Sequence, residues 1–243
     1  MISKNQIKFI RQLELKKYRR REGLFVAEGP KVVGDLLHRY QPYAIYATPA
    51  YQGPKTEEIT DDELRRISFL QHPQQVVALF PIPKAVASMP DLQHPGLSLA
   101  LDGVQDPGNL GTIIRIADWF GIDTIYCSED TADAYNPKVV QATMGSIARV
   151  NIIYNNLEKL FDSLPNDYPV YGTLLDGEDI YQQTLTPYGI IVMGNEGNGI
   201  SAEIRQRINH RLLIPSYRQA DTAESLNVAI ATAITCAEFR RRK

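Results

Sequence analysis

Three loops in the second half of the sequence carry residues whose types and spacing could do chemistry. The first is DGVQDPGNLGTIIRIADWFG, residues 102–121, where Asp106–Gly108 predicts a tight turn and Asn109 is placed to cap the next helix. Arg115 follows on this otherwise largely apolar helix. A guanidinium held there could grip a phosphate or position a reacting oxygen, and the alternative is an arginine that reaches to the surface.

The second loop, residues 190–201 (IIVMGNEGNGIS), is rich in glycine. An apolar strand runs directly into Gly194-Asn-Glu-Gly-Asn-Gly199, and Ser201 is placed to cap the next helix. Three glycines in six residues after a buried strand indicate close backbone approach. The spacing G-x-x-G-x-G matches neither the dinucleotide fingerprint nor a Walker A loop, so both common nucleotide signatures are missing.

The third loop follows a short strand that ends at Ile214-Pro215. A polar stretch leads into a small-residue helix, expected over Glu224–Arg240, with Ser225 and Asn227 at its start. These two side chains either cap the helix alone or belong to a site. The alanines of the helix allow tight packing against a sheet or a second subunit.

The elements that must position these loops alternate between strand and helix from residue 97 onwards. This rhythm predicts a mostly parallel sheet covered on both faces, with ligands at the carboxyl ends of its strands. Helices are expected over Asn109–Phe120 and Glu224–Arg240. A further helix is expected to begin at Asn136-Pro137, with Asn136 as its cap. The expected strands are Leu97–Leu101, Ile122–Cys127, Val150–Tyr154, Val170–Leu174, Ile190–Met193 and Arg211–Ile214.

The N-terminal third is predicted to be a small α/β module. Residues 81–96 contain four prolines, which favour extended chain, so we place a linker there and expect domains over residues 1–90 and 96–243. The module's expected helices are Asn5–Leu15 and Glu28–Tyr40, and its expected strands are Leu24–Ala27, Tyr43–Ala47 and Val76–Phe80.

Charge is unevenly spread along the chain. The net charge is −2, yet residues 1–40 hold ten Lys/Arg against four Asp/Glu, a balance of +6. The densest cluster is either a solvated helix end or a patch that contacts the phosphates of a nucleic acid. Its members, our candidate RNA-binding residues, are Lys16, Lys17, Arg19, Arg20 and Arg21, beside Tyr18.

Composition excludes several classes of protein. With 243 residues and 44% hydrophobic residues the chain is long and apolar enough to fold without staples. Two cysteines, Cys127 and Cys236, and four histidines without ligand spacing argue against a disulfide framework and against a metal site. No apolar run is long enough to span a membrane and the N-terminus has no secretory signal, so we expect a cytoplasmic protein.

Together the three loops resemble the SpoU (TrmH-like) family of RNA ribose 2′-O-methyltransferases, over about residues 97–243. The resemblance is carried by Asn109–Arg115 with Ala117 and Gly121, Asn136–Gly145, Gly194–Gly199, Ile214-Pro215 and Ser225–Val228. More weakly, Phe25–Gly29 resembles the small substrate-binding domain common at that end of family members.

The resemblance implies an α/β fold with a C-terminal trefoil knot that binds S-adenosylmethionine, a homodimer, and methylation of a ribose 2′-hydroxyl in rRNA or tRNA. The implied catalytic positions are Asn109, Arg115, Glu196, Ser225 and Asn227. The implied cofactor-binding positions are Thr173, Leu174, Gly194, Asn195, Gly197, Gly199, Ile214 and Leu226.

Two points stay open at this stage. Arg115 is implied to act as general base, but a guanidinium should stay charged and could equally clamp a phosphate or stabilise an alkoxide. Trp119, and Ser216-Tyr217 where a methionine is frequent, depart from the family pattern. The alternatives are an RNA-binding member without catalysis and a dehydrogenase-like nucleotide enzyme, which lacks its fingerprint here.

Overall fold

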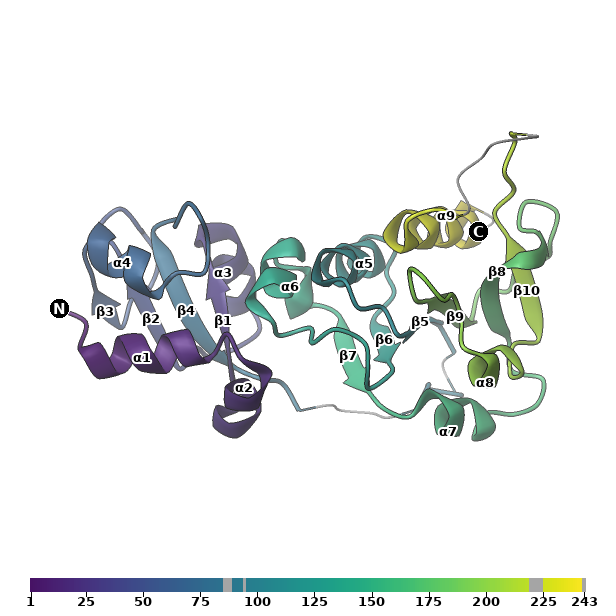
Figure 1. The fold of residues 1–243 in the computed structure, drawn as a ribbon, viewed down its shortest axis with the longest axis horizontal. Helices are drawn as coiled ribbons and strands as arrows, with labels where there is room; N and C mark the ends of the chain where they lie inside the picture. The colour runs from purple at the N-terminus through teal and green to yellow at the C-terminus, as the bar shows by residue number, and fades with distance from the viewer. Residues whose placement is uncertain (85–88, 94, 219–224, 242–243) are drawn as a thin grey trace. The chain divides into compact units, whose positions relative to one another are not determined.

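The computed structural model describes residues 1–84, 89–93, 95–218 and 225–241, which divide into two compact units (Figure 1). The first unit comprises Met1–Lys84 and Asp133–Ala148, and the second comprises Ala85–Ala132 and Arg149–Lys243. No helix in the described part of the chain is long and apolar enough to cross a bilayer.

The first unit is built on a four-stranded sheet of order β1-β4-β2-β3. Its strands are β1 (Leu24–Glu28), β2 (Ala44–Ala47), β3 (Glu57–Glu58) and β4 (Val76–Pro81), with β4 antiparallel to both β1 and β2. Its helices are α1 (Lys4–Gln12), α2 (Lys16–Glu22), α3 (Pro30–Leu37), α4 (Asp61–Ile67), α6 (Pro137–Ala142) and the 3-10 helix η1 (Ser146–Ala148).

The two faces of this sheet are covered by different helices. On one face, Ile10 of α1 and Leu64 of α4 pack with Val26 and Leu79 in one buried cluster. On the other face, α3 packs against β1 and β4, while α6 packs against β1. The sequence predicted α1, α3 and the longer strands, but it did not single out α2 or α4.

The segment Asp133–Ala148 belongs to the first unit, whereas we expected residues 96–243 to form one uninterrupted domain. The reason is packing, because Tyr135 lies against the Phe25 ring at 5.1 Å and η1 contacts α3. As predicted, Asn136 caps α6, by accepting a 2.9 Å hydrogen bond from the amide of Lys138. The boundaries 1–90 and 96–243 stay a prediction.

The second unit is built on a six-stranded sheet of order β10-β8-β9-β5-β6-β7, in which every neighbouring pair is parallel. The strands are β5 (Leu97–Asp102), β6 (Thr124–Cys127), β7 (Asn151–Tyr154), β8 (Val170–Asp179), β9 (Gly189–Gly194) and β10 (His210–Leu213). The predicted parallel sheet is confirmed. The trefoil knot stays a prediction of the family resemblance.

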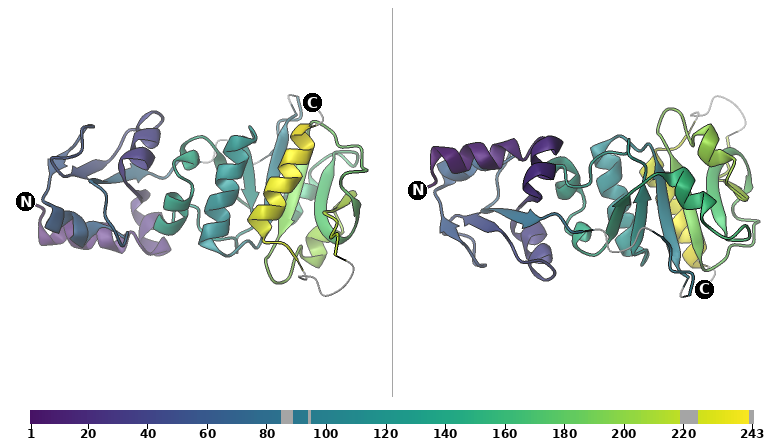
Figure 2. Two further views of the ribbon diagram at one scale, coloured as in Figure 1. Left: turned by 90° about the horizontal axis from the view of Figure 1, so that it is seen from above. Right: turned by 90° about the horizontal axis from the view of Figure 1, so that it is seen from below.

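Two pairs of helices cover the two faces of this sheet (Figure 2). On one face lie α5 (Pro107–Trp119) and α9 (Val228–Arg241), which contact each other. On the other lie α7 (Leu157–Asp162) and α8 (Ala202–Arg205), whose apolar side chains join Tyr126, Val170 and Val192 in one cluster. Burial on both faces explains why β5 and β9 are nearly continuous apolar runs in the sequence.

Candidate active site

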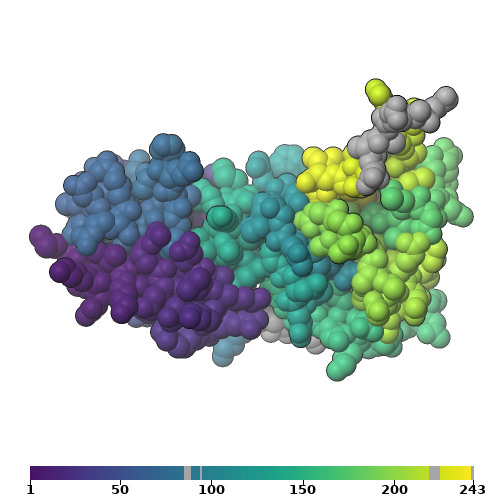
Figure 3. Space-filling model, in the orientation of Figure 1, coloured from purple at the N-terminus to yellow at the C-terminus, as the bar shows by residue number. Residues whose placement is uncertain are grey.

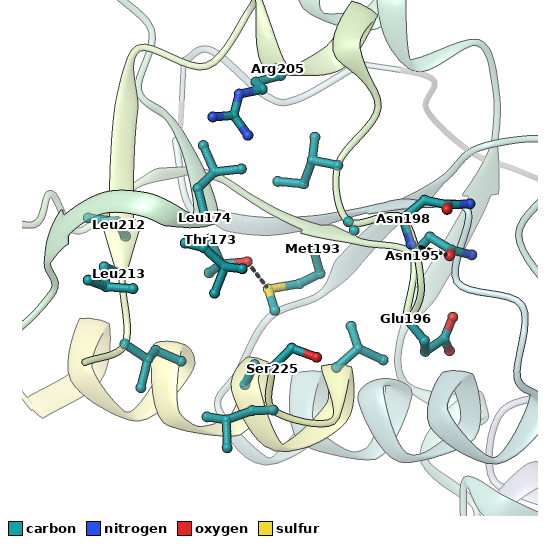
Figure 4. A pocket seen from close by; sticks show the side chains of 18 of the residues that line it. Thr173, Leu174, Met193, Asn195, Glu196, Asn198, Arg205, Leu212, Leu213 and Ser225 are labelled. Carbon is teal, nitrogen blue, oxygen red and sulfur yellow. Dashed lines mark hydrogen bonds between the residues drawn. The ribbon is translucent and has the colours of Figure 1, made fainter. Parts of the chain in front are cut away.

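A cavity of 560 Å³ lies at the carboxyl ends of β8, β9 and β10, within the second unit (Figure 4). This is the edge at which a parallel sheet is expected to hold its ligands. The glycine loop forms one wall, residues 173–176 of β8 form another, and Ser225 and Leu226 before α9 complete the lining. The eight residues expected to bind a cofactor all line it: Thr173, Leu174, Gly194, Asn195, Gly197, Gly199, Ile214 and Leu226.

Asn195 holds the glycine loop in its shape. Its backbone exchanges two 2.9 Å hydrogen bonds with Gly199, and its side-chain oxygen accepts from the amides of Gly197 and Asn198 at 2.9 and 3.0 Å. Its side-chain nitrogen donates to the carbonyl of Gly103 after β5, at 2.7 Å. The loop is therefore fixed both internally and to the neighbouring strand.

Gly194 is the glycine that this loop requires most strictly. A Cβ added there would lie 2.3 Å from both the carbonyl carbon of Gly199 and the amide nitrogen of Ile200, a distance that real Cβ atoms do not show. Gly199 has a φ of +69°, the left-handed region that favours glycine. A Cβ at Gly197 would only touch Asn195 Oδ1, at 3.6 Å. The predicted close backbone approach is confirmed at Gly194.

Three of the expected catalytic side chains form one hydrogen-bonded chain. The side-chain nitrogen (Nδ2) of Asn227 donates to Asn109 Oδ1 at 2.9 Å, and the side-chain nitrogen of Asn109 donates to Glu196 Oε1 at 2.9 Å. The carboxylate also accepts longer bonds, of 3.4 Å, from the backbone amides of Gln105 and Asp106. The three loops singled out in the sequence therefore meet at one place, beside the cavity that Glu196 lines.

Of the two flanking helices, α5 is capped by another residue than expected, whereas α9 is capped by Asn227, one of the two residues expected at its start. Asp106, not Asn109, caps α5, because its carboxylate accepts from the Asn109 backbone amide at 2.7 Å. This arrangement leaves the whole Asn109 side chain free for Asn227 and Glu196. Asn227 caps α9 through its side-chain oxygen, which accepts from Ala229 and Ile230 at 2.9 and 3.3 Å. The helix begins at Val228, and the expected start at Glu224 lies outside the described residues.

The remaining expected catalytic residues take different positions. Ser225 lines the cavity, and Figure 4 shows its hydroxyl directed into it. Arg115 is exposed on α5 and does not line the cavity. Among the described residues it has no hydrogen-bond or ion-pair partner. Ser201 is the N-cap residue of α8, but its side chain makes no capping bond; its backbone amide donates to Asp102 instead, at 2.7 Å.

Comparison with known proteins assigns the family. Residues 96–237 match the SpoU rRNA Methylase family, and residues 4–78 match the MRM3-like substrate binding domain. The chain belongs to the SpoU rRNA methylase family. The resemblance read from the three loops is thereby confirmed, and the dehydrogenase-like alternative is excluded.

Relatives from other organisms extend over nearly the whole chain. The 23S rRNA (guanosine(2553)-2′-O)-methyltransferase RlmP of Bacillus subtilis is 32% identical over 251 residues, covering 98% of this chain and 97% of the relative. The structure of a putative RNA methyltransferase of the TrmH family from Porphyromonas gingivalis is 43% identical, covers 100% of both chains and has a TM-score of 0.89. The structure of an AdoMet-bound rRNA methyltransferase from Sinorhizobium meliloti is 32% identical, covers 100% and 96%, and has a TM-score of 0.84.

Two charged residues that line the cavity of this SpoU protein escaped the sequence analysis. Arg205 of α8 forms an ion pair with Asp176 of β8, and Asp176 also accepts from Arg211 at 3.2 Å. Figure 4 shows the Arg205 guanidinium at the end of the cavity away from Glu196 and Ser225. No spacing in the sequence marks the pair, because 29 residues separate its members.

The candidate RNA-binding cluster on α2 needs one correction. Arg19 is buried, with its side chain 2% exposed, in an ion pair of 2.6 Å with Asp133, and it donates to the carbonyls of Leu13 and Glu14. It therefore cannot contact a phosphate. Arg21 is exposed, stacks over Tyr18 at 4.8 Å and pairs with Glu22. Among the described residues no group of three or more His, Cys, Asp or Glu could hold a metal ion.

Proposed function

We propose that the chain transfers the methyl group of S-adenosylmethionine to a ribose 2′-hydroxyl of RNA, using the site described above. The observation that carries the proposal is the chain from Asn227 through Asn109 to Glu196, which brings the three loops together beside the cavity. A relative named as a 23S rRNA 2′-O-methyltransferase extends over 98% of this chain.

The residues of the cavity fit S-adenosylmethionine. A volume of 560 Å³ falls within the roughly 300–1,000 Å³ of small-molecule sites. Leu174, Ile214 and Leu226 offer apolar surface to an adenine ring, while the glycine loop offers backbone groups without side chains. When bound, the cofactor supplies an activated methyl group on a sulfonium. Glu196 supplies a carboxylate that complements this positive charge.

Catalysis of this reaction depends chiefly on alignment, because the hydroxyl oxygen must approach the methyl group in line with the carbon–sulfur bond that breaks. Asn109 and Asn227 act as positioning residues, since they fix Glu196 and the starts of α5 and α9. Ser225 offers a hydroxyl inside the cavity. Arg115 aligns the ribose hydroxyl and stabilises its oxygen as the proton leaves. Its guanidinium group is planar and charged, which suits it to binding an oxyanion or a phosphate.

The position of Arg115 supports a homodimer. Arg115 lies six positions after Asn109 on α5, which places the two side chains roughly 120° apart around the helix axis. Arg115 is exposed, does not line the cavity of its own protomer, and is available to a second copy. The exposed side chains on α5 and α9 include Trp119, 85% exposed, and Ile230, 52% exposed, which a second copy would cover.

The substrate is an RNA, and the first unit is the part that holds it. Its match to the MRM3-like substrate binding domain and the positive balance of residues 1–40 support this assignment. The Bacillus subtilis relative that extends over 98% of the chain is named for 23S rRNA, and a Synechocystis relative of the same extent is named for tRNA or rRNA, so ribosomal RNA is the first substrate to test, with tRNA as the second. The reaction then belongs in the cytoplasm, where bacterial ribosomes assemble.

The test is methylation of unmodified transcripts of 23S rRNA and of a tRNA pool, with labelled S-adenosylmethionine. We expect label in one of the two, at a nucleotide whose 2′-oxygen becomes resistant to alkaline cleavage. Calorimetry must show cofactor binding in the same preparation. Tight RNA binding without cofactor binding would favour the alternative, an RNA-binding protein that has lost catalysis.

A further inference from the structure

The charge at the start of α1 runs against the dipole of the helix, whereas Arg11 in its last turn agrees with it. Carboxylates are favoured in the first turn of a helix and cations in the last turn. Helix α1 begins with Lys4 and has no acidic residue in its first turn. Even its capping box, formed with Ser3, uses the neutral Gln6 where a glutamate would add favourable charge.

Helix α4 of the same unit provides an internal comparison. It has the same capping box, but with Glu63, and its first turn holds Asp61 and Asp62. Its last turn carries Arg65 and Arg66. The chain therefore follows the ordinary charge preference at both ends of α4 and departs from it in the first turn of α1. Folding of the first unit does not account for cations at the start of α1.

The cations of α1 lie on one face. Lys4, Lys8 and Arg11 are spaced four and three residues apart, which places them within roughly 60° around the helix axis. Ile10, by contrast, is fully buried against the sheet. Lys4 and Lys8 are exposed and have no hydrogen-bond or ion-pair partner among the described residues. We call Lys4, Lys8 and Arg11 the α1 stripe.

Arg11 anchors one end of the α1 stripe beside an aromatic ring. It donates to the carbonyl of Ser68 at 2.6 Å and lies 4.4 Å from the centroid of the Phe69 ring. The carboxylates near α1 are engaged elsewhere: Glu57 accepts from Gln6, and Glu63 accepts from the Ile2 amide. Glu14, 3.9 Å from Arg11, and the buried Glu28 offset the charge at the Arg11 end of the stripe.

The exposed cations of α2 continue the stripe. Figure 3 shows the purple N-terminal segment, which holds α1 and α2, as one continuous part of the visible surface of the first unit. Lys17 and Arg20 of α2 are exposed, and α2 also starts with lysines and has no acidic residue in its first turn. With Arg19 buried, the charge available to a partner lies on these two residues, on Arg21 and on the α1 stripe.

We infer that the RNA backbone docks across the α1 stripe and the exposed cations of α2, with Lys4 and Lys8 as phosphate contacts. The inference rests on the proposed function and names the surface that holds its substrate. A row of exposed cations, of which Lys4 and Lys8 have no partner among the described residues, is suited to a polyanion, whose bound counterions are released on contact. RNA is the polyanion that the proposed reaction requires.

The test compares two double variants in binding to a 23S rRNA transcript over a series of salt concentrations. Lys4→Gln/Lys8→Gln should weaken binding roughly tenfold at moderate salt and lower the slope of log K against log salt by about two. Its melting temperature should stay unchanged or rise. The matched control, Lys31→Gln/Arg39→Gln, removes two cations at α3, on the opposite face of the sheet, and should leave both quantities near wild type.

The outcomes separate this inference from the proposed function. If wild type binds and methylates the transcript while Lys4→Gln/Lys8→Gln keeps its affinity and salt slope, the α1 stripe is not the RNA surface. An equal loss in the α3 control would also overturn the assignment, because the effect would then be one of net charge. If wild type neither binds cofactor nor methylates RNA, the proposed function itself fails.

Discussion

The side-chain oxygen of Asn109 accepts a 2.9 Å hydrogen bond from the amide of Asn227, although 118 residues separate the two. The other end of the Asn109 amide donates to Glu196. One side chain therefore serves as acceptor and donor at once, and it joins the starts of α5 and α9 to the glycine loop. An aspartate or a leucine of similar size could not make both bonds.

The first prediction tests this double use. Asn109→Asp keeps the acceptor for Asn227, but it removes the donor and places a second carboxylate against Glu196. We expect turnover to fall at least tenfold and the free energy of unfolding to fall by about 0.5–1.5 kcal/mol, the net contribution of one hydrogen bond. Asn198→Asp is the control, because it adds the same charge to the glycine loop at an exposed side chain. Equal losses of turnover and stability in both variants would mean that the added negative charge, and not the lost hydrogen bond, causes the effect.

The second prediction concerns two glycines of one loop. Gly194→Ala should abolish measurable cofactor binding, because its Cβ would collide with backbone atoms of Gly199 and Ile200 that cannot move independently. Gly197→Ala should bind within a few-fold of wild type, because its Cβ meets only the Asn195 side-chain oxygen at 3.6 Å. Calorimetric titration with S-adenosylhomocysteine measures both. Comparable affinities in the two variants would show that the loop adapts and that its backbone does not shape the cavity.

Much of the fold was open to prediction because its causes are local. Continuous apolar runs separated by turn residues predicted β5, β9 and their parallel neighbours, and Asn136 before Pro137 predicted the start of α6. The placement of Asp133–Ala148 was not predictable in this way. Its position depends on the fit of Tyr135 against Phe25, a contact across more than a hundred residues.

The third prediction separates structure from RNA contact on α2. Arg19 and Asp133 form an ion pair whose side chains are 2% and 14% exposed. Arg19→Gln would leave the Asp133 carboxylate without its partner, so the free energy of unfolding should fall by about 3–5 kcal/mol. Denaturant unfolding measures the loss. The neighbouring Arg20→Gln should be neutral in stability and weaken RNA binding. The prediction is wrong if the two variants show the opposite pattern.

The fourth prediction concerns the cysteines. Burial raises the pKa of the Cys236 thiol to about 12 and raises that of the fully buried Cys127 even further. Since the thiolate is the reactive form, neither side chain should react with an aromatic disulfide reagent in the folded protein at neutral pH. Both should react fully in denaturant. Rapid labelling of the native protein with loss of methylation would instead indicate an accessible thiol near the site.

The candidate site was predictable in its members but not in its connections. The residue types and spacing of the three loops, with the family resemblance, identified Asn109, Glu196 and Asn227. The burial of Arg19 and the ion pair of Arg205 with Asp176 both depend on partners distant in sequence. The cap of α5 was assigned to the wrong side chain, because Asp106 and Asn109 are equally good capping residues and only the geometry decides between them.

The last prediction concerns Arg115, which is exposed on α5 and unpartnered among the described residues. If it aligns the ribose hydroxyl, Arg115→Ala should reduce turnover by roughly two or more orders of magnitude, the range of acid–base and oxyanion effects. Cofactor affinity should barely change, because Arg115 does not line the cavity. Arg115→Lys should fail as well if the planar guanidinium fork is needed.

The control for Arg115 is Arg207→Gln, which removes an arginine that pairs with Asp162 at 2.7 Å on the α7 and α8 face. It should retain wild-type turnover. Because Arg115 would serve the partner's cavity, mixing Arg115→Ala with an inactive Asn109→Asp chain should form heterodimers with one fully intact site and recover part of the activity. Full single-turnover activity of Arg115→Ala alone, with fold and cofactor binding preserved, would show that this arginine takes no part in the reaction.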